Sequence, residues 1–242
     1  MTRHAASAAS AADPPLPQGG EKVRAVRAMF DAIAPRYVLV NRVMTFGLDG
    51  RWRRRAVRTL RLARGSLVLD LAAGTGDLCR VLTIAGLQPV GFDLSFGMLA
   101  HARTRAPLAQ ADALRLPIPD GRADGVVSGF ALRNFVDLGA FLAETARVLR
   151  PGGRIALLDV AQPTNAVLRA GHAFYFGKVV PRIGGLLSDP AAYRYLPKSV
   201  AYLPEPDELV AMVRRAGFGD AHRATLSGGI SQLLVGTRDP SA

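Results

Sequence analysis

The sequence predicts an α/β fold in which helices cover both faces of a mostly parallel, seven-stranded sheet. Three observations support this. Apolar runs alternate with amphipathic segments from residue 66 onward, most of these runs are almost continuously apolar, and none approaches the roughly 18–20 residues that a membrane span requires. Strands buried on both faces show such apolar runs, and parallel strands need crossover helices between them. At 242 residues the chain is long enough to bury one such core.

The first part of the chain precedes this alternation. Residues 1–20 are rich in Ala, Ser, Pro and Gly, so we expect a disordered tail. Residues 21–64 are predicted to form a helical arm. Its first helix ends near Pro35, and its second, basic helix covers about 51–63. In the first helix, apolar side chains recur at helical spacing at Val23, Val26, Phe30 and Ile33.

The strands and their helices follow in order. Five apolar runs predict parallel strands at 66–72, 88–94, 106–113, 123–132 and 154–161. Helices are predicted from about residue 76, over 95–105 and over 138–150. The pattern breaks at 162–204, which we expect to be an inserted cap. A helix over 206–217 and two short β-like runs, 221–226 and 230–237, then predict an antiparallel hairpin at one end of the sheet. We therefore expect a single domain over 21–242.

Charge and cysteine content limit the class of protein. The formal net charge is +12, and seven arginines lie between Arg51 and Arg64. Such a cluster attracts polyanions or anionic lipid headgroups, although it is equally typical of a solvated helix face. The single cysteine, Cys79, cannot form an internal disulfide, and no apolar h-region follows the amino terminus. We therefore expect a cytoplasmic protein.

The loop "AAGTGD" after the first predicted strand is the expected ligand site. In an open α/β sheet, ligands bind beyond the carboxyl ends of the strands, where the strand order reverses. Gly74 and Gly76 allow the backbone to approach a ligand closely. Asp93 lies 17 residues beyond Gly76, at the end of the second predicted strand. That placement suits a carboxylate that accepts hydrogen bonds from a ribose diol.

This loop fits a dinucleotide poorly. Ala72 and Cys79 stand where the first and third glycines of a dinucleotide fingerprint belong, and Asp77 would repel a pyrophosphate. A ligand with a ribose, no phosphate and a positive charge suits the site better, and S-adenosylmethionine is such a ligand. Asp70 is placed to help bind its ammonium group. After the third predicted strand, Asp112 can accept a hydrogen bond from the adenine amine while Ala113 donates its N–H. The four scattered histidines and single cysteine predict no metal.

Several stretches resemble one enzyme family. They run from about Met29 to Gly229 and read "MFDAIAPRYVLVNRVMTFGLDGRWRRRAV", "LDLAAGTGD", "ALRN", "RVLRPGG", "PRIG", "AYRYLPKSV" and "LSGGI". With them the chain resembles the quinone C-methyltransferases of menaquinone and ubiquinone biosynthesis, within the class I S-adenosylmethionine-dependent methyltransferases. "RVLRPGG" is common to many methyltransferases, whereas "ALRN" and "AYRYLPKSV" are much more specific. The resemblance implies the Rossmann-like class I methyltransferase fold.

The resemblance also implies donor contacts and a methyl acceptor. The donor contacts are Gly74, Thr75, Gly76, Asp93, Asp112 and Ala113. The family has a further contact from a serine, whose place Gly129 takes here, so Ser128 or the backbone would have to replace it. The acceptor implied is a prenylated quinol. The arginine-rich composition is typical of GC-rich bacteria and favours demethylmenaquinol, converted to menaquinol. The benzoquinol precursor of ubiquinone, or another small phenol or carbon acid, stays open as an alternative.

Two other departures from the family pattern concern the acceptor. The residue after Tyr37 is Val38 where the family usually has aspartate. The last strand reads Leu233, Leu234, Val235, Gly236 where the family usually reads Leu-His-Arg-Gly. We expect both changes to remove polar groups near the substrate.

The chemistry requires alignment of the acceptor carbon with the methyl group, and a group that takes or relays the phenolic proton. Arg133 and Asn134 follow the fourth predicted strand and are candidate catalytic residues. Arg133 would stabilise a phenolate, or would only form a salt bridge or a tie to a carbonyl. Asp159, near the end of the fifth predicted strand, is a candidate base.

Other classes of function fit less well. Base-directed N-methyltransferases usually carry an Asn/Asp-Pro-Pro-aromatic motif after the fourth strand, where this chain reads "SGFALRN", so we expect no nucleic acid substrate. A nicotinamide dehydrogenase is disfavoured by Ala72 and Asp77. A prenylated substrate implies transient membrane-surface contact, for which the basic segment 51–64 is the candidate, at the inner face of the cell membrane. The sequence indicates no oligomeric state.

Overall fold

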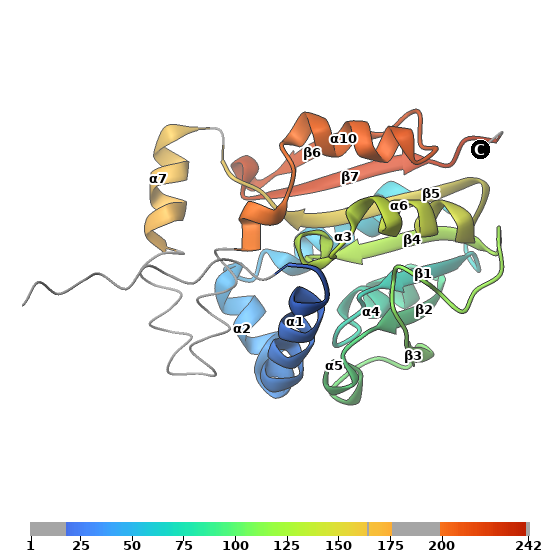
Figure 1. Ribbon diagram of the computed structural model, residues 1–242, viewed down its shortest axis with the longest axis horizontal. Coiled ribbons are helices and arrows are strands. Elements are labelled where there is room, and N and C mark those ends of the chain that lie inside the picture. The colour runs from blue at the N-terminus through green and yellow to red at the C-terminus, as the bar shows by residue number, and fades with distance from the viewer. Residues whose placement is uncertain (1–17, 164, 176–198, 241–242) are drawn as a thin grey trace, which may run out of the picture.

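A computed structural model describes residues 18–163, 165–175 and 199–240. Its seven strands form one sheet in the order β3-β2-β1-β4-β5-β7-β6 (Figure 1). The strands are β1 (Leu67–Leu71), β2 (Gln88–Asp93), β3 (Leu108–Gln110), β4 (Ala123–Gly129), β5 (Leu149–Val160), β6 (His222–Leu226) and β7 (Ser231–Thr237).

The sheet confirms the predicted α/β architecture. β1 to β5 pair in parallel with their neighbours, whereas β7 runs antiparallel to both β5 and β6. The order reverses between β1 and β4, because the chain builds outward through β2 and β3 and then returns to the other side of β1. The carboxyl ends of β1 and β4 therefore flank the switch point at which open α/β sheets bind ligands.

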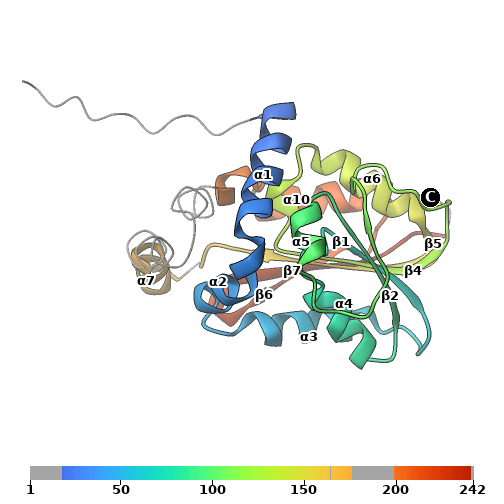
Figure 2. The same cartoon turned by 90° about the horizontal axis from the view of Figure 1, so that it is seen from below.

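Helices cover both faces of the sheet (Figure 2). One face carries α3 (Asp49–Leu60) and α4 (Asp77–Ile84), and the other carries α6 (Leu138–Val148) and α10 (Pro206–Arg215). The sheet divides the apolar core into two clusters. Successive residues of β5 alternate between them: Ile155 packs with Phe141, whereas Ala156 packs with Trp52. This period of two is the geometry of a strand buried on both faces.

The amino-terminal part of the chain forms three helices and a short turn, in agreement with its predicted helical character. They are α1 (Gly19–Ile33), a 3₁₀ turn η1 (Ala34–Arg36), α2 (Tyr37–Met44) and α3. α3 ends where Arg61 adopts a left-handed conformation with φ of 51°. The described residues begin at Gln18, just before α1, so most of the predicted tail, 1–20, lies outside them. The division of the chain into tail, arm and cap stays a prediction.

One helix is shorter than predicted. α5 covers only Phe96–Ala100, not 95–105. After it, the Arg103 N–H donates to the Thr75 carbonyl at 3.0 Å, so the chain is tied to the glycine loop and cannot continue the helix.

The predicted cap, 162–204, is described only in part. It contains α7 (Ala166–Phe174) and the 3₁₀ turn η4 (Ser199–Tyr202), while Tyr193 and Tyr195 lie outside the described residues. Two short turns complete the secondary structure that positions the site, η2 (Leu132–Asn134) and η5 (Ser227–Gly229). Across the described ranges, no helix is both long and apolar enough to cross a bilayer.

Candidate active site

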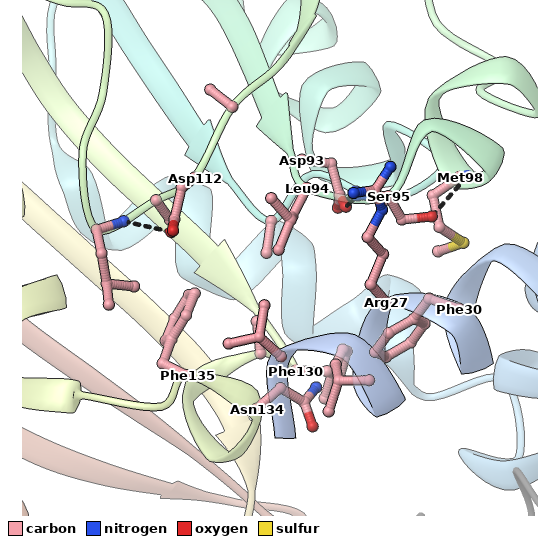
Figure 3. A pocket seen from close by; sticks show the side chains of 18 of the residues that line it. Arg27, Phe30, Asp93, Leu94, Ser95, Met98, Asp112, Phe130, Asn134 and Phe135 are labelled. Carbon is pink, nitrogen blue, oxygen red and sulfur yellow. Dashed lines mark hydrogen bonds between the residues drawn. The ribbon is translucent and has the colours of Figure 1, made fainter. Parts of the chain in front are cut away.

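A cavity opens at the switch point (Figure 3). It encloses about 830 Å³ outside the atoms, part of it open to solvent. Its floor is formed by the ends of β1, β2 and β4 and the segment after β3. Its opposite wall is α1.

Asp93 is the best-placed of the predicted donor residues. Its carboxylate lines the cavity and accepts backbone N–H bonds from Gly74 at 2.7 Å and from Ser95 at 2.8 Å. A carboxylate offers about four lone-pair positions. Two therefore remain for a vicinal diol, as the predicted ribose contact requires. Burial raises the pKa of Asp93, against the effect of these two hydrogen bonds.

The glycine loop meets the cavity at one of its two glycines. Gly74 lines the cavity with φ of +56°, and a Cβ there would lie 3.0 Å from the Met98 Cε. Gly76 has φ of +76°, but a Cβ would lie 2.5 Å from the Thr104 Cγ2. The second glycine is therefore required by packing against the chain that leaves α5. Neither Gly76 nor Thr75 lines the cavity.

The predicted adenine contacts lie at the other end of the cavity. Asp112 and Ala113 both line it, and Asp112 is exposed. One Asp112 oxygen accepts the Leu114 N–H at 2.9 Å, which holds the carboxylate beside the opening. The structure therefore brings Gly74, Asp93, Asp112 and Ala113 together around one space.

Asp70 is not at the cavity surface. It is 1% exposed, lies inside β1 and does not line the cavity. Its Oδ2 lies 3.3 Å from the Cys79 Sγ, and its Oδ1 has no hydrogen-bond partner in the described part of the chain. Burial raises the pKa of Asp70 to about 7. Its predicted contact with the donor ammonium stays a prediction, and the geometry gives no direct path for it.

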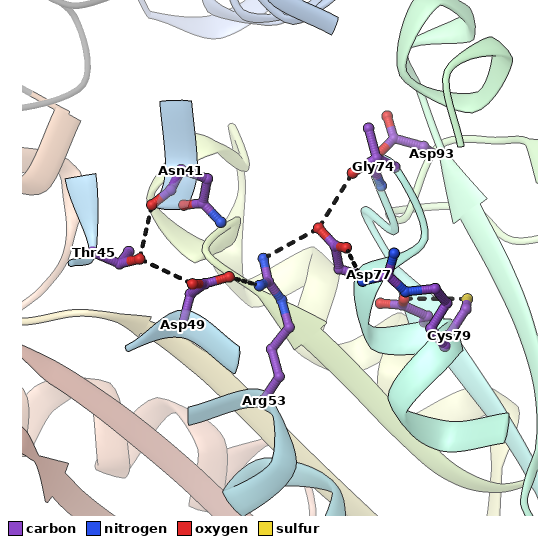
Figure 4. A network of polar contacts seen from close by, with 11 residues as sticks. Asn41, Thr45, Asp49, Arg53, Gly74, Asp77, Cys79 and Asp93 are labelled. Carbon is purple, nitrogen blue, oxygen red and sulfur yellow. Dashed lines mark hydrogen bonds and ion pairs between the residues drawn. The ribbon is translucent and has the colours of Figure 1, made fainter. Parts of the chain in front are cut away.

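A polar network joins the arm to the glycine loop (Figure 4). Arg53 of α3 is 6% exposed and pairs with both Asp49 and Asp77, the latter at 3.7 Å. Asp77 also pairs with Arg80 at 2.9 Å. Because two arginines neutralise Asp77, our prediction that this carboxylate repels a pyrophosphate is weakened. Arg53 itself is not part of a basic surface, whereas the other six arginines of segment 51–64 are exposed.

The three candidate catalytic residues are divided by the cavity wall. Asn134 lines the cavity, whereas Arg133 and Asp159 do not. Asp159 is fully buried and forms an ion pair with the Arg133 guanidinium. Arg133 also donates to the Phe130 carbonyl at 2.8 Å and to the Ser199 hydroxyl at 3.0 Å. These contacts are the salt bridge and carbonyl tie that were the alternative role of Arg133, and catalytic roles for the pair stay predictions.

The arm supplies residues that sequence reasoning did not assign to the site. Val23, Val26, Arg27 and Phe30 of α1 and Tyr37 of α2 line the cavity. Burial raises the pKa of Tyr37, while the nearby Arg53 opposes this. The apolar spacing of α1 indicated a buried face, but it did not single out these residues as the lining of the donor cavity.

The departures from the family pattern have structural explanations. Gly129 lines the cavity, and a Cβ there would lie 2.9 Å from the Leu78 Cδ1, so that leucine occupies the space of a side chain. Ser128 cannot replace the missing hydroxyl, because it is fully buried and donates to the Leu71 carbonyl at 2.7 Å. Leu234 is 1% exposed in the core beside Leu157. Our expectation that the last strand's departure lies near the substrate is therefore wrong.

Comparisons with known proteins agree with this geometry. The model of the ubiE/COQ5 methyltransferase family matches residues 18–238. The demethylmenaquinone methyltransferase of Thermus thermophilus is 44% identical, covering 87% of this chain and 100% of that protein. The ubiquinone/menaquinone biosynthesis C-methyltransferase UbiE of Syntrophotalea carbinolica is also 44% identical, covering 88% and 93%.

Solved structures agree on the fold. A methyltransferase in complex with the Haloferax volcanii Trm112 activator has a TM-score of 0.63 at 20% identity, covering 87% of this chain and 97% of that chain. The Haemonchus contortus phosphoethanolamine N-methyltransferase 2, solved with S-adenosyl-L-methionine, has a TM-score of 0.55 at 16% identity, covering 75% and 50%. The fold, the family match and the two relatives together confirm the resemblance that the motifs predicted. This chain belongs to the ubiE/COQ5 methyltransferase family and is an S-adenosylmethionine-dependent methyltransferase.

Proposed function

We propose that this enzyme methylates a ring carbon of a prenylated quinol, and that demethylmenaquinol is its acceptor. The observation that carries the proposal is the 44% identity to a demethylmenaquinone methyltransferase along that protein's whole length. A second relative so named, from Deinococcus radiodurans, is 43% identical. Relatives named for both ubiquinone and menaquinone biosynthesis keep the benzoquinol precursor as the second candidate.

The cavity fits the methyl donor. Asp93 would hold the ribose diol, Asp112 the adenine amine and the Ala113 N–H an adenine nitrogen. Gly74 leaves room for the donor against the backbone. The apolar side chains of α1, Val26 and Phe30 among them, would exclude water from the opposite side. When bound, S-adenosylmethionine supplies an electrophilic methyl group that an acceptor carbon takes, while S-adenosylhomocysteine leaves and the quinol loses one proton.

The chain's own residues would orient the acceptor and manage that proton. Asn134 is the candidate that reaches the cavity, and its amide would hold a quinol hydroxyl. Tyr37 lines the same cavity and offers a second hydroxyl contact. Arg133 and Asp159 lie one layer behind, where their ion pair would hold η2 and hence Asn134 in place.

The direct test is methyl transfer from labelled donor to reduced quinols with two-isoprene tails. We expect the naphthoquinol to be methylated at least about tenfold more efficiently than the benzoquinol, judged by kcat/KM. A preference for the benzoquinol would support the second candidate, and no methylation of either would overturn the proposal.

The three candidate residues are tested separately. Asn134→Ala should lower kcat without changing the affinity for S-adenosylhomocysteine. Arg133→Ala leaves the Asp159 charge buried and unpaired, which typically costs about 3–5 kcal/mol of stability. The paired variant Arg133→Met, Asp159→Leu removes both charges and avoids that cost. If the paired variant retains full turnover, neither residue is catalytic. If turnover falls while donor affinity holds, the pair acts on the acceptor side.

Membrane contact is the remaining part of the proposal. Exposed arginines on α3, Arg54, Arg55 and Arg58 among them, would rest against anionic headgroups. We expect co-sedimentation with anionic vesicles that weakens as salt is raised. Changing these three arginines to glutamine should reduce binding without lowering the melting temperature, because all three are exposed. Binding that is absent, or unchanged at high salt, would overturn this part.

A further inference from the structure

A second cavity lies beside the donor cavity. It encloses about 670 Å³ outside the atoms, part of it open to solvent, between the α2–α3 turn and α7. Its lining is almost entirely apolar: Met44, Phe46, Leu48, Trp52, Leu168 and Ile230 contribute most of it. Phe46 and Val167 at its rim are 66% and 80% exposed, so the cavity opens to solvent between apolar side chains.

This cavity opens at the same edge of the sheet as the donor cavity. The Ile230 carbonyl accepts the Ala161 N–H at 2.9 Å, which places Ile230 at the carboxyl end of β5. The Phe130 N–H donates to the Leu158 carbonyl at 2.6 Å, which places Phe130 beside the same strand. The two cavities therefore lie side by side along one edge.

One layer of aromatic rings separates them. Phe130 lines the donor cavity and Trp52 lines the second cavity, and their ring centroids are 6.2 Å apart. The Trp52 Nε1–H donates to the Ser227 hydroxyl at 2.9 Å, which fixes the indole. Arg53 follows Trp52 on α3, and its Cζ lies 5.5 Å from the centroid of the Phe130 ring. The Phe130 and Trp52 rings are thus the side chains that stand between the two cavities.

We propose that the second cavity binds the part of the acceptor's isoprenoid tail that lies nearest the ring. This rests on the proposed function, because it needs an acceptor with a polar ring and an apolar tail. Apolar lining with few polar groups suits a branched hydrocarbon chain, and an aromatic partition suits the junction between ring and tail. The exposed rim of Phe46 and Val167 then continues toward the surface, where a longer tail leaves the protein. Phe46 also packs against Tyr175, with centroids 4.3 Å apart, so the rim is held in place.

Gly171 offers a precise way to fill this cavity. It lines the cavity from α7, and a Cβ built on it meets no atom within 4 Å. Gly171→Leu should therefore occupy tail space without a clash inside the protein. Gly20→Leu is the matched control, because Gly20 is an exposed helical glycine where a Cβ makes only an ordinary contact, 3.6 Å from Arg24.

The first experiment compares 1,4-naphthoquinols with no tail, one isoprene unit and two units. We expect Gly171→Leu to lower kcat/KM at least about tenfold for the two-unit substrate and less than about twofold for the tail-less one, because displacing a few buried CH₂ groups of the tail is enough to lose a factor of about ten. Gly171→Ala should give a smaller loss, and Gly20→Leu none. S-adenosylhomocysteine affinity should stay unchanged. An equal loss for all three substrates, or no loss, would overturn the proposal.

The second experiment does not depend on turnover. Trp52 is the single tryptophan of the chain and lines this cavity, so all tryptophan emission comes from its wall. Geraniol, a two-unit isoprenoid alcohol with no quinone ring, should change that emission saturably in the wild type, with at least about tenfold weaker binding in Gly171→Leu. If no naphthoquinol is methylated but geraniol binds in this way, the proposed acceptor is wrong and the tail site stands. If geraniol causes no saturable change, the tail site is wrong, whatever the enzyme methylates.

Discussion

Removing the carboxylate of Asp31 should weaken donor binding, although Asp31 does not line the donor cavity. Its Oδ1 accepts the Ser95 hydroxyl and the Gly97 N–H, the latter at 2.9 Å. Ser95 and Gly97 begin α5, directly after Asp93. Asp31 therefore ties α1, one wall of the cavity, to the segment that follows Asp93, the proposed ribose contact.

The size of the effect follows from these two bonds. Hydrogen bonds to a charged group contribute about 1.5–3 kcal/mol each. The Asp31 side chain is 38% exposed, so the low end applies. Loss of both bonds would cost about 3 kcal/mol, and loss of one about 1.5 kcal/mol if water replaces the other. At 1.4 kcal/mol per factor of ten, Asp31→Ala should weaken binding by about 10- to 100-fold.

Isothermal titration with S-adenosylhomocysteine measures this. Asp124→Ala is the control. Asp124 also accepts a backbone N–H, from Leu67 at 2.8 Å, and pairs with Arg150. These contacts lie at the amino ends of β1 and β4, away from the cavity. Asp124→Ala should lose stability and keep its donor affinity. If Asp31→Ala changes the dissociation constant less than about threefold, other contacts hold α1 closed and the reasoning fails.

Three further variants test the site. Burial raises the pKa of Asp70 to about 7, whereas the unfolded side chain titrates near 4. The wild type should therefore lose stability relative to Asp70→Asn as pH rises from about 4 to about 7. Urea unfolding at pH 5 and pH 8 measures this difference. Gly129→Ser should bind S-adenosylhomocysteine about fivefold more tightly than Gly129→Ala, since both displace Leu78 but only serine restores a hydroxyl. Arg53→Met should lower stability by about 3–5 kcal/mol, measured by urea unfolding, because it leaves Asp49 without its buried partner.

The sheet was predictable from the sequence because its signal is local. Most strands of the core are short apolar runs, and most boundaries are marked by Gly, Pro or a polar cluster. β5 is an exception, because it begins at Leu149, inside the helix predicted over 138–150. That Asp93 and Asp112 line one cavity was predictable for a related reason: both follow strands, and parallel strands bring their carboxyl ends to one edge. Asp70 satisfied the same pattern but lies inside β1, so a position near a strand's end does not establish that a side chain reaches the cavity.

The role of the arm was not predictable because its contacts join distant parts of the chain. Asp31 meets residues more than 60 positions away, and the Lys22 ammonium donates to the Phe135 carbonyl, 113 positions away, at 2.8 Å. Arg53 is a second residue whose long-range contacts could not be predicted from the sequence, although it lies in a run of arginines. In the sequence it is one of seven clustered arginines, but in the structure it is buried and pairs with Asp49 and with Asp77 of the glycine loop.

Lys22 and Asp31 together explain why the donor site needs the arm. They lie nine residues apart on α1, a rise of about 13.5 Å, and bind opposite sides of the mouth. Lys22 binds the loop after β4 and lies 3.7 Å from the centroid of the Tyr202 ring, whereas Asp31 binds the start of α5. α1 thus spans the cavity and is fixed at both ends by polar contacts, with apolar side chains between them. Burial lowers the pKa of Lys22 to about 8, so the Lys22 contact is formed at a desolvation cost that the half-exposed Asp31 does not share. The Asp31 end also borders Asp93, the proposed ribose contact, so removing the Asp31 contact should weaken donor binding more than removing the Lys22 contact.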